Sequence, residues 1–429
     1  MTSFRSVFRG DTRELQNLCK SITDCHHSTP KYTPTGKLVV RNFNIANGRM
    51  LLDDLSFTDE AHFKERTSRA LPQPGDLIIT REAPMGEVCV IPSDLECCLG
   101  QRMVLIKPDL EKVDSKYLLY SLMSEYVQAQ IAKSDGTGSI VSNLRIPLLK
   151  ELLIPYLELA EQREIARVLD AIDQKIDLNK KINRELEAMA KLIYDYWFVQ
   201  FDFPDADGKP YKSSGGKMVY NEELKREIPD GWNDGTLDDL GEIVGGSTPS
   251  TQNPANFSER GIPWITPNDL SNNVGNKFIT RGEQDITDAG VESASLKLYP
   301  KNTVLMSSRA PVGYMAIARN ELTTNQGFKS FIPTKDFSSE FIFYSVKNAM
   351  RTIIQYSSGS TFKEIPGSTL KIVKCVLPKT EVANKFTGVV KDIFEKQDVL
   401  ERETKDLIEL RDWLLPMLMN GQVTVQDSH

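Results

Sequence analysis

The sequence predicts an α+β fold with two similar globular domains, each followed by a long helix. Two observations lead to this fold class. Segments of the first half recur in the second half in the same order, and two stretches carry apolar residues at a seven-residue spacing. The predicted order is a first globular domain at 1–156, a first helix at 157–200, a linker at 201–228, a second globular domain at 229–379, a second helix at 380–420 and a tail at 421–429.

The internal repeat is the stronger of the two observations. The offset between matching segments stays between about 222 and 227 residues, which is hard to obtain by chance. Arg81 and Arg309 are interpreted as matching residues just before a shared Ala-Pro-x-Gly. The matching segments are 36–42 with 261–267, 77–86 with 304–313, 100–101 with 325–326, 136–139 with 359–361, and 153–155 with 376–378.

Each globular domain contains short apolar runs that favour strands. Leu77–Thr80, Met103–Ile106 and Val304–Ser307 are such runs, and Gly, Pro or Asn residues bound them. Helical spacing of apolar residues follows at Lys116–Ala132 and Glu340–Gln355. This mixture predicts sheet and helix within each domain and leaves the strand order open.

The two long helices carry heptad repeats, which are typical of a coiled coil. We expect them to pair in an antiparallel coiled coil; the alternative is that each helix packs on its own globular domain. Asn179 is a polar residue in the first heptad row, where it can set the register. The first helix has rows Ile165, Ile172, Asn179, Leu186, Ile193 and Val168, Ile182, Met189, Tyr196, and the second helix has Phe386, Ile393, Leu400, Leu407, Leu414.

Composition restricts the class of protein without naming it. The chain is 40 % hydrophobic and 26 % charged, which is ordinary for a globular protein. No apolar run approaches the ~18 residues of a membrane span, and the N-terminus does not resemble a signal peptide, so we expect a cytoplasmic protein. A net charge of −7 argues against a protein that coats DNA without sequence specificity. A protein with this net charge can still carry a local cluster of basic residues that binds DNA.

The known catalytic patterns are missing from the sequence. Asn253-Pro254-Ala255-Asn256 lacks the second Pro and the aromatic residue of an adenine-methylating loop. Nuclease-like letters at Pro108-Asp109 and at 204–209 are too closely spaced for two acids and a lysine to converge on a metal ion. Cys19, Cys25, His26 and His27 have no second pair at zinc spacing. No phosphate-binding loop is present, so we expect neither catalytic nor metal-binding residues.

Polar residues at equivalent places in both halves favour a recognition function. Arg, Lys, Asn, Gln, Ser and Thr on turns are the side chains that reach base edges and phosphates of DNA. A single such residue is more often a solvated loop residue, but the repetition strengthens the set. The candidate DNA-binding residues are Arg41, Asn42, Arg81, Arg102, Thr266, Asn268, Ser308, Arg309, Gln326, Lys329, Ser360 and Lys363.

With these features the chain resembles the specificity subunits of type I restriction-modification systems over nearly its full length. The most specific stretch is 192–216, LIYDYWFVQFDFPDADGKPYKSSGG, and Ile228-Pro229-Asp230-Gly231-Trp232 then opens the second domain as in that family. Residues 245–249, GGSTP, and the end of the second helix continue the resemblance. The first half lacks the Pro-x-Gly-Trp opening and the Gly-Ser-Thr-Pro segment, so the resemblance is weakest at 1–35.

The resemblance implies a non-catalytic subunit with two target-recognition domains that read a split, asymmetric DNA site. The helix pair, as spacer, would set the gap between the half-sites. The implied partners are double-stranded DNA, two modification subunits that methylate adenine N6, and restriction subunits that translocate and cleave DNA. S-adenosylmethionine, ATP and Mg would be cofactors of those partners and not of this chain.

Large apolar residues at the helix ends are candidates for the partner interface, because such residues anchor interfaces. The alternative is that they close the ends of the coiled coil. These residues are Tyr194, Trp197, Phe198, Trp413 and Leu414. Rival interpretations of the whole chain are an enzyme with an unusual site, a scaffold that binds protein only, and a specificity subunit of another restriction type.

Overall fold

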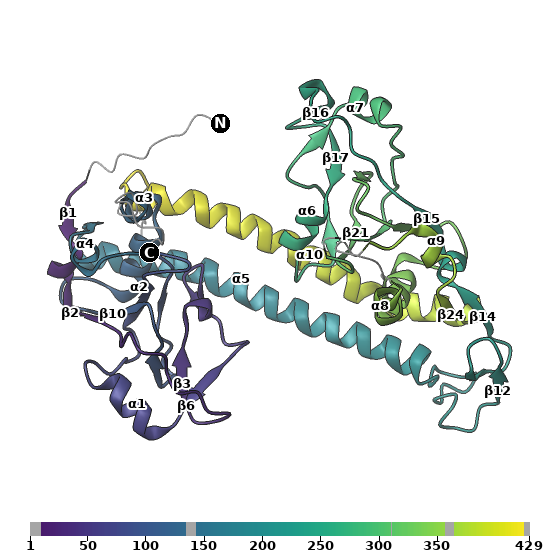
Figure 1. Cartoon of the computed structure of the whole chain (residues 1–429), viewed down its shortest axis with the longest axis horizontal. Coiled ribbons are helices and arrows are strands. Elements are labelled where there is room, and N and C mark those ends of the chain that lie inside the picture. Colours follow the sequence, from purple (N-terminus) through teal and green to yellow (C-terminus); the bar gives the residue numbers. More distant parts are fainter. Residues whose placement is uncertain (1–9, 134–142, 310, 357–363, 424–429) are drawn as a thin grey trace, which may run out of the picture. The chain divides into compact units, whose positions relative to one another are not determined.

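The computed structural model describes residues 10–133, 143–309, 311–356 and 364–423 (Figure 1). It contains two compact units. Unit 1 comprises Met1–Ile176 with Asp406–His429, and unit 2 comprises Asp177–Lys405. The two long helices, α5 (Leu159–Tyr194) and α10 (Thr380–Met419), each contribute one part to each unit. Each unit therefore holds one globular domain and a segment of both helices.

Unit 1 has a four-stranded antiparallel sheet in the order β2-β10-β7-β8 and a three-stranded sheet in the order β6-β3-β9, in which β3 and β9 are parallel. Two-stranded pairs β1-β11 and β4-β5 complete it. The strands are β1 Thr12–Glu14, β2 Cys19–Asp24, β3 Lys37–Val40, β4 Ile45–Ala46, β5 Arg49–Met50, β6 Ser56–Thr58, β7 Leu77–Thr80, β8 Val88–Val90, β9 Cys97–Leu99, β10 Met103–Pro108 and β11 Leu153–Pro155. The helices are α1 Glu60–Thr67, α2 Ser115–Met123, α3 Glu125–Lys133 and α4 Ile146–Lys150. The predicted helix at Lys116–Ala132 is thus two helices, because Ser124 between them has an extended backbone with ψ 147°.

Unit 2 repeats this plan with a five-stranded sheet in the order β15-β23-β20-β21-β18 and a four-stranded sheet in the order β16-β19-β17-β22. Pairs β12-β13 and β14-β24 accompany them. The strands are β12 Met218–Asn221, β13 Arg226–Pro229, β14 Asn233–Thr236, β15 Glu242–Val244, β16 Phe257–Ser258, β17 Ile262–Ile265, β18 Phe278–Ile279, β19 Asp285–Ile286, β20 Val304–Met306, β21 Met315–Ala318, β22 Thr323–Thr324, β23 Ser330–Ile332 and β24 Lys374–Leu377. The helices are α6 Pro267–Asn272, α7 Asp288–Ser293, α8 Ser339–Gln355 and α9 Gly367–Leu370.

The repeat found in the sequence is also a repeat of hydrogen bonds. The parallel pair β3-β9 in unit 1 corresponds to the parallel pair β17-β22 in unit 2. Gly36 and Gly261 open the equivalent strands β3 and β17, and a Cβ atom at either would lie 2.3 Å from a backbone oxygen, of Thr58 or Ile286. Because only glycine permits this close approach, the shared glycine has a physical reason in both halves.

The long helices pair in antiparallel fashion, as the heptads predict. In unit 2 the later part of α5 packs with the first part of α10, and in unit 1 the first part of α5 packs with the end of α10. The second predicted row of α5 is wrong, since Met189 is 52 % and Tyr196 is 37 % exposed. The buried second row instead includes Asn183 and Ala190, which the apolar pattern cannot reveal because neither is a large apolar residue. That row is Leu169, Ile176, Asn183, Ala190 and Trp197.

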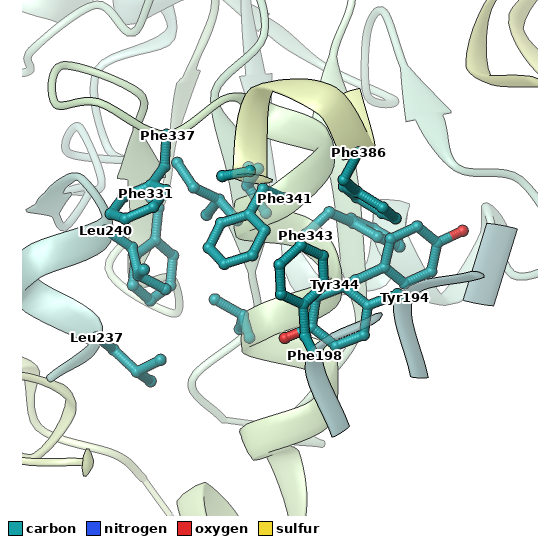
Figure 2. Close-up of a cluster of buried hydrophobic side chains, with 14 of the residues drawn as sticks. Tyr194, Phe198, Leu237, Leu240, Phe331, Phe337, Phe341, Phe343, Tyr344 and Phe386 are labelled. Atoms are coloured by element: carbon teal, nitrogen blue, oxygen red, sulfur yellow. The ribbon is translucent and has the colours of Figure 1, made fainter. Parts of the chain in front are cut away.

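The aromatic residues at the end of α5 and in the π-helical turn that follows it (Asp195–Val199) lie in the core of unit 2, where Tyr194 and Phe198 contact helix α8 and the start of α10 (Figure 2). Tyr194, Trp197 and Phe198 are only 5–7 % exposed. Their assignment to a partner interface is therefore corrected, because buried side chains cannot meet a partner. They close the end of the helix pair, which is the alternative stated above.

The end of α10 is anchored in the same way in unit 1. Leu418 and Met419 are buried in its core, and Leu414 packs against that core while half-buried. Trp413 differs from these residues because it is 54 % exposed. Of the predicted interface residues, Trp413 alone has a largely exposed side chain.

The stretch at 201–228 has the polar turns that predict a linker, and it is also folded onto unit 2. Phe201 and Phe203 are buried in the core, and Asp202 accepts hydrogen bonds from the backbone and hydroxyl of Ser213. Strand β12 lies within it. Among the described residues no helix is long and apolar enough to cross a membrane.

Candidate nucleic-acid interface

In unit 2, four loop segments that follow strand ends meet in one cluster. These segments are 245–249 after β15, 266–268 after β17, 307–309 after β20 and 325–329 after β22. The backbone N–H of Asn325 donates to Ile265 O at 3.0 Å, and the N–H of Ser308 donates to Gly327 O at 2.8 Å. The strands thus deliver loops that are far apart in sequence to one place, which we call cluster 2.

The segment 245–249 is attached to cluster 2 by three hydrogen bonds. The N–H of Ser247 donates to Thr324 O at 3.1 Å, and the indole N–H of Trp264 donates to Ser247 O at 3.1 Å. The hydroxyl of Thr248 donates to Gln326 Oε1. Thr248 is a site residue that the polar-loop reasoning missed, although it lies in the quoted GGSTP segment and its motif could have identified it.

The predicted DNA-binding residues of the second half differ in their solvent exposure. Asn268 and Gln326 are exposed, while Ser308 is fully buried. Thr266 caps helix α6, where its hydroxyl donates to Asp269 Oδ2 at 2.7 Å. Thr266 and Ser308 are therefore parts of the framework of cluster 2, and Asn268 and Gln326 are parts of its surface.

Arg309 and Lys329 supply the positive charge of cluster 2. The Arg309 side chain is 36 % exposed, and its only ion pair among the described residues is a long one of 3.9 Å to Glu364. Burial lowers the pKa of Lys329; Arg309 acts in the same direction, and Glu364 opposes both. Two cations with one shared carboxylate favour an added anion at this place.

Unit 1 has an equivalent cluster, cluster 1, made from the segments 41–44, 81–84 and 100–102. The N–H of Gly100 donates to Val40 O at 2.8 Å, as Asn325 does to Ile265 in unit 2. The N–H of Arg81 donates to Arg102 O at 2.7 Å, and the amide of Asn42 donates to Ala83 O at 2.6 Å. The first-half candidates are therefore brought together too.

Arg81 is bound within unit 1 and is not a free surface residue. Its side chain is 12 % exposed, and its Nη1 lies 3.1 and 3.0 Å from the two carboxylate oxygens of Asp24. Nε donates to Leu144 O at 2.9 Å, and Nη2 donates to Asn143 Oδ1 at 3.1 Å. The Arg81 side chain thus fastens the 81–84 segment of cluster 1 to Asp24 and to the segment of Asn143 and Leu144.

The pairing of Arg81 with Arg309 as equivalent residues is wrong by one position. The hydroxyl of Thr80 donates to Pro84 O at 2.6 Å, as the hydroxyl of Ser307 donates to Pro311 O at 2.8 Å. With Thr80 equivalent to Ser307, Arg81 is equivalent to Ser308. The ungapped match of 77–86 with 304–313 also places Glu82 opposite Arg309, so pairing the two arginines by residue type alone shifts them by one position.

The true equivalent of Arg309 is Glu82, so the two clusters place opposite charges at the same position. Glu82 Oε2 lies 3.1 Å from Arg102 Nε, and Glu82 Oε1 accepts a hydrogen bond from the amide of Asn143 at 2.6 Å. The Arg102 side chain is 53 % exposed. Cluster 1 therefore presents an arginine on a different loop from cluster 2.

Arg41 and Asn42 complete cluster 1. The Arg41 guanidinium carbon lies 4.3 Å from the ring centroid of Phe43 and 5.3 Å from that of Tyr32. It also donates to the hydroxyl of Ser56 at 3.4 Å. Ser360 and Lys363, the last two predicted residues, lie outside the described residues.

Arg66 is a buried residue of unit 1 that the sequence gave no reason to select. Its guanidinium donates to the backbone oxygens of Leu99 at 2.8 Å, Gly100 at 2.9 Å, Ser28 at 3.1 Å and His26 at 3.1 Å. It therefore holds the loop of Arg102 in place.

The described parts of the chain contain neither a metal-binding group nor an activated thiol. No group of three His, Cys, Asp or Glu residues there could hold a metal ion. The described cysteines are free thiols, and burial raises the pKa of Cys89 and Cys97 to about 12, which keeps them protonated.

Two similar domains with equivalent loop clusters, on a pair of coiled-coil helices, define a modular recognition protein. A family model described as type I restriction modification DNA specificity domain matches residues 12–188 and 229–410. The chain belongs to this family of type I restriction-modification specificity subunits. Members of this family are the non-catalytic, DNA-recognising component of type I restriction-modification systems.

Individual relatives agree with the family. The MjaIX specificity subunit of Methanocaldococcus jannaschii is 41 % identical over 200 residues, which are 44 % of this chain and 45 % of that relative. This match thus spans about half the length of either protein. The HindI specificity subunit of Haemophilus influenzae is 27 % identical over 406 residues, 81 % of this chain and 86 % of the relative.

The fold has a solved counterpart. The crystal structure of a type I restriction-modification S subunit from M. genitalium matches with a TM-score of 0.61 over 99 % of both chains, at 16 % sequence identity. A likeness at this identity shows the fold alone. It agrees with two globular domains on an antiparallel helix pair.

Proposed function

We propose that the chain reads a split, asymmetric DNA site, one half-site per globular domain, and directs partner subunits to methylate adenine N6 or to cleave the DNA. The observation that carries this proposal is the equivalence of clusters 1 and 2, which share backbone hydrogen bonds but differ in side chains. Arg309 stands where cluster 1 has Glu82. Two equivalent frameworks with different side chains suit a site whose halves differ in sequence.

Exposed and half-buried polar residues of each cluster are the proposed contacts with DNA. In cluster 2, Arg309 and Gln326 have the donors and acceptors that base edges in the major groove require. Lys329, with its lowered pKa, suits a phosphate, whose charge favours the protonated amine. In cluster 1 the corresponding contacts are Arg102 and Asn42.

The buried residues have a different proposed role. Arg81, Thr266 and Ser308 hold the loops in place and act on DNA only through them, because their polar atoms are buried or bound within the protein. Arg41 stacks on Phe43 and can join the contact surface from the edge of cluster 1. Ser360 and Lys363 stay proposals from the sequence.

Two equivalent apolar patches are the proposed docking sites for two methyltransferase subunits. A shift of 221 residues relates the heptads of α5 to those of α10, and it also relates Leu192 to Trp413, which are 66 % and 54 % exposed. The same shift relates each residue of an apolar patch on α5 to a residue of an apolar patch on α10. The α5 patch is Met189, Leu192 and Tyr196, and the α10 patch is Leu410, Trp413 and Met417.

These patches replace the buried aromatic residues as the proposed interface. Five of these side chains are exposed and Met417 is half-buried, and apolar side chains at equivalent positions outside the coiled-coil seam suit two copies of one partner. The cofactors for the chemistry, S-adenosylmethionine, ATP and Mg, are proposed to bind to the partner subunits.

Methylation mapping tests the proposed function directly. The chain is expressed with its cognate modification subunit in a methylation-free host, and N6-methyladenine is mapped by sequencing. A split motif with a fixed gap, which is lost when this chain is omitted, is the expected result. Confirmed complex formation without any motif would favour a scaffold and would overturn the proposed DNA contacts.

A further inference from the structure

Lys277 is a buried lysine that joins the second globular domain to both long helices within unit 2. Its side chain is 3 % exposed. Nζ lies 2.7 Å from Glu187 Oε2 of α5 and donates to Gln397 Oε1 of α10 at 2.7 Å. It also donates to the hydroxyl of Tyr344 in α8 at 2.9 Å and lies 3.6 Å from the ring centroid of Phe394. One amino group therefore bridges three helices.

The backbone beside Lys277 is fastened to α10 as well. The N–H groups of Lys277 and Phe278 donate to the two carboxylate oxygens of Glu401 at 2.6 and 3.1 Å. Arg319, at the end of β21, donates to Glu401 Oε2 at 2.7 Å and to Asp398. The domain thus meets α10 through polar bonds on two successive turns of the helix.

Packing alone does not explain a lysine at this position. Burial of an ammonium group is unfavourable, and here burial lowers the pKa of Lys277 to about 8 although Glu187 opposes the shift. A methionine of similar length would fill the same space without this penalty. In some proteins, buried charged groups of this kind contribute to a unique geometry more than to stability.

The three bonds of Nζ define one relative placement of α5, α10 and the second domain. A slip of α5 along α10 by one turn, about 5.4 Å, would separate Glu187 from Gln397, so that Nζ could reach only one of them. A tilt of the domain would break the same bonds. Geometry at this site is therefore fixed by directional contacts and not only by apolar packing.

We infer that Lys277 is a positioning residue that holds the second domain on the helix pair and thereby determines which gap between half-sites the protein accepts. This inference rests on the proposed function. One added base pair displaces a half-site by about 3.4 Å and rotates it by about 35°. A rigidly held domain rejects such a site, whereas a domain that can tilt accepts it. Since the side-chain contacts of Lys277 described above are with helices and not with the loops of cluster 2, the half-site sequences should not depend on it.

The test compares Lys277→Met with Lys347→Met in the assembled methyltransferase complex. Lys347 is the matched control, because its Nζ lies 2.6 Å from Glu187 Oε1 while its side chain is 40 % exposed. Methylation is mapped at native half-sites separated by the native gap and by one base pair more or less. We expect K277M to raise methylation at altered gaps at least about tenfold, with unchanged half-site sequences, and K347M to leave the gap strict.

A second variant keeps the inference testable if K277M does not fold. Gln397→Met removes the bond to α10 and retains the ion pair with Glu187, and a relaxed gap in Q397M supports the inference. A folded K277M with a strict gap overturns it, as does a strict gap in Q397M when K277M does not fold. A wild-type complex that gives no split motif overturns the proposed function itself, which distinguishes the two failures.

Discussion

Arg81 and Arg309 look alike in the sequence, and the structure predicts opposite consequences of replacing them with alanine. Arg81 is 12 % exposed and its partner Asp24 is 24 % exposed. Loss of one member of a fully buried ion pair costs about 3–5 kcal/mol, and the residual exposure here reduces the estimate to about 2–3 kcal/mol. Leu144 O would lose its side-chain donor as well.

The expected result for Arg81→Ala is a less stable unit 1. At about 2–4 °C per kcal/mol for a unit of this size, the thermal midpoint should fall by about 5–10 °C. The assay is thermal unfolding followed by circular dichroism, with urea unfolding as an independent measure. Weaker DNA binding should accompany the loss of stability, since cluster 1 loses its fastening.

Arg309→Ala should leave stability within about 0.5 kcal/mol of the wild type, because its pair with Glu364 is long and exposed. The equilibrium dissociation constant for the cognate DNA should rise by about 5- to 150-fold, which corresponds to the ~1–3 kcal/mol of one good base contact. Fluorescence anisotropy with labelled duplexes measures it. Arg167→Ala on α5, which removes one exposed charge of unit 1, is the control for net charge.

Two results would refute this reasoning. Unchanged unfolding of Arg81→Ala together with weakened DNA binding would make Arg81 a direct reader of DNA. Unchanged DNA binding of Arg309→Ala would remove the central contact of cluster 2.

Three further predictions concern other parts of the molecule. Leu192→Glu or Trp413→Glu should each remove one of two methyltransferase subunits from the complex, and the double variant should remove both; sedimentation velocity measures this, and intact assembly of the double variant would contradict the proposed patches. Because the pKa of Lys277 is lowered to about 8 in the folded protein, the unfolded chain binds more protons than the folded chain between pH 8 and 10.5. Relative to Lys277→Met, the free energy of unfolding of the wild type should therefore rise over that range by up to about 3 kcal/mol. Urea unfolding at pH 7 and pH 10 measures this, and an equal change of the urea midpoint in both proteins would argue against it. Arg66→Lys should destabilise unit 1 by about 2 kcal/mol, because an ammonium cannot reach four backbone oxygens, and methylation mapping should show poorer recognition of one half-site only; loss at both half-sites would contradict a local role.

Sequence patterns were sufficient for the features that depend on neighbouring residues or on a fixed spacing. The internal repeat, the two heptad helices, the family and two strands follow from such patterns. The strands are β7 at Leu77–Thr80 and β20, predicted at Val304–Ser307 and observed at Val304–Met306. Heptads specify an interface because every seventh residue returns to the same helix face. A constant offset indicates a duplicated fold, because equivalent glycines and turns are required wherever the backbone geometry is the same.

The tertiary structure alone decided which of the candidate side chains are available. Arg81 is bound because Asp24 and Leu144, both more than 50 residues away, converge on it, whereas Arg309 pairs, among the residues that the structure describes, with Glu364 alone at 3.9 Å. Asn183 belongs to the helix seam although its type gives no sign of burial. Burial and pairing depend on segments that folding brings together from distant parts of the chain, so a pattern of neighbouring residues cannot contain them.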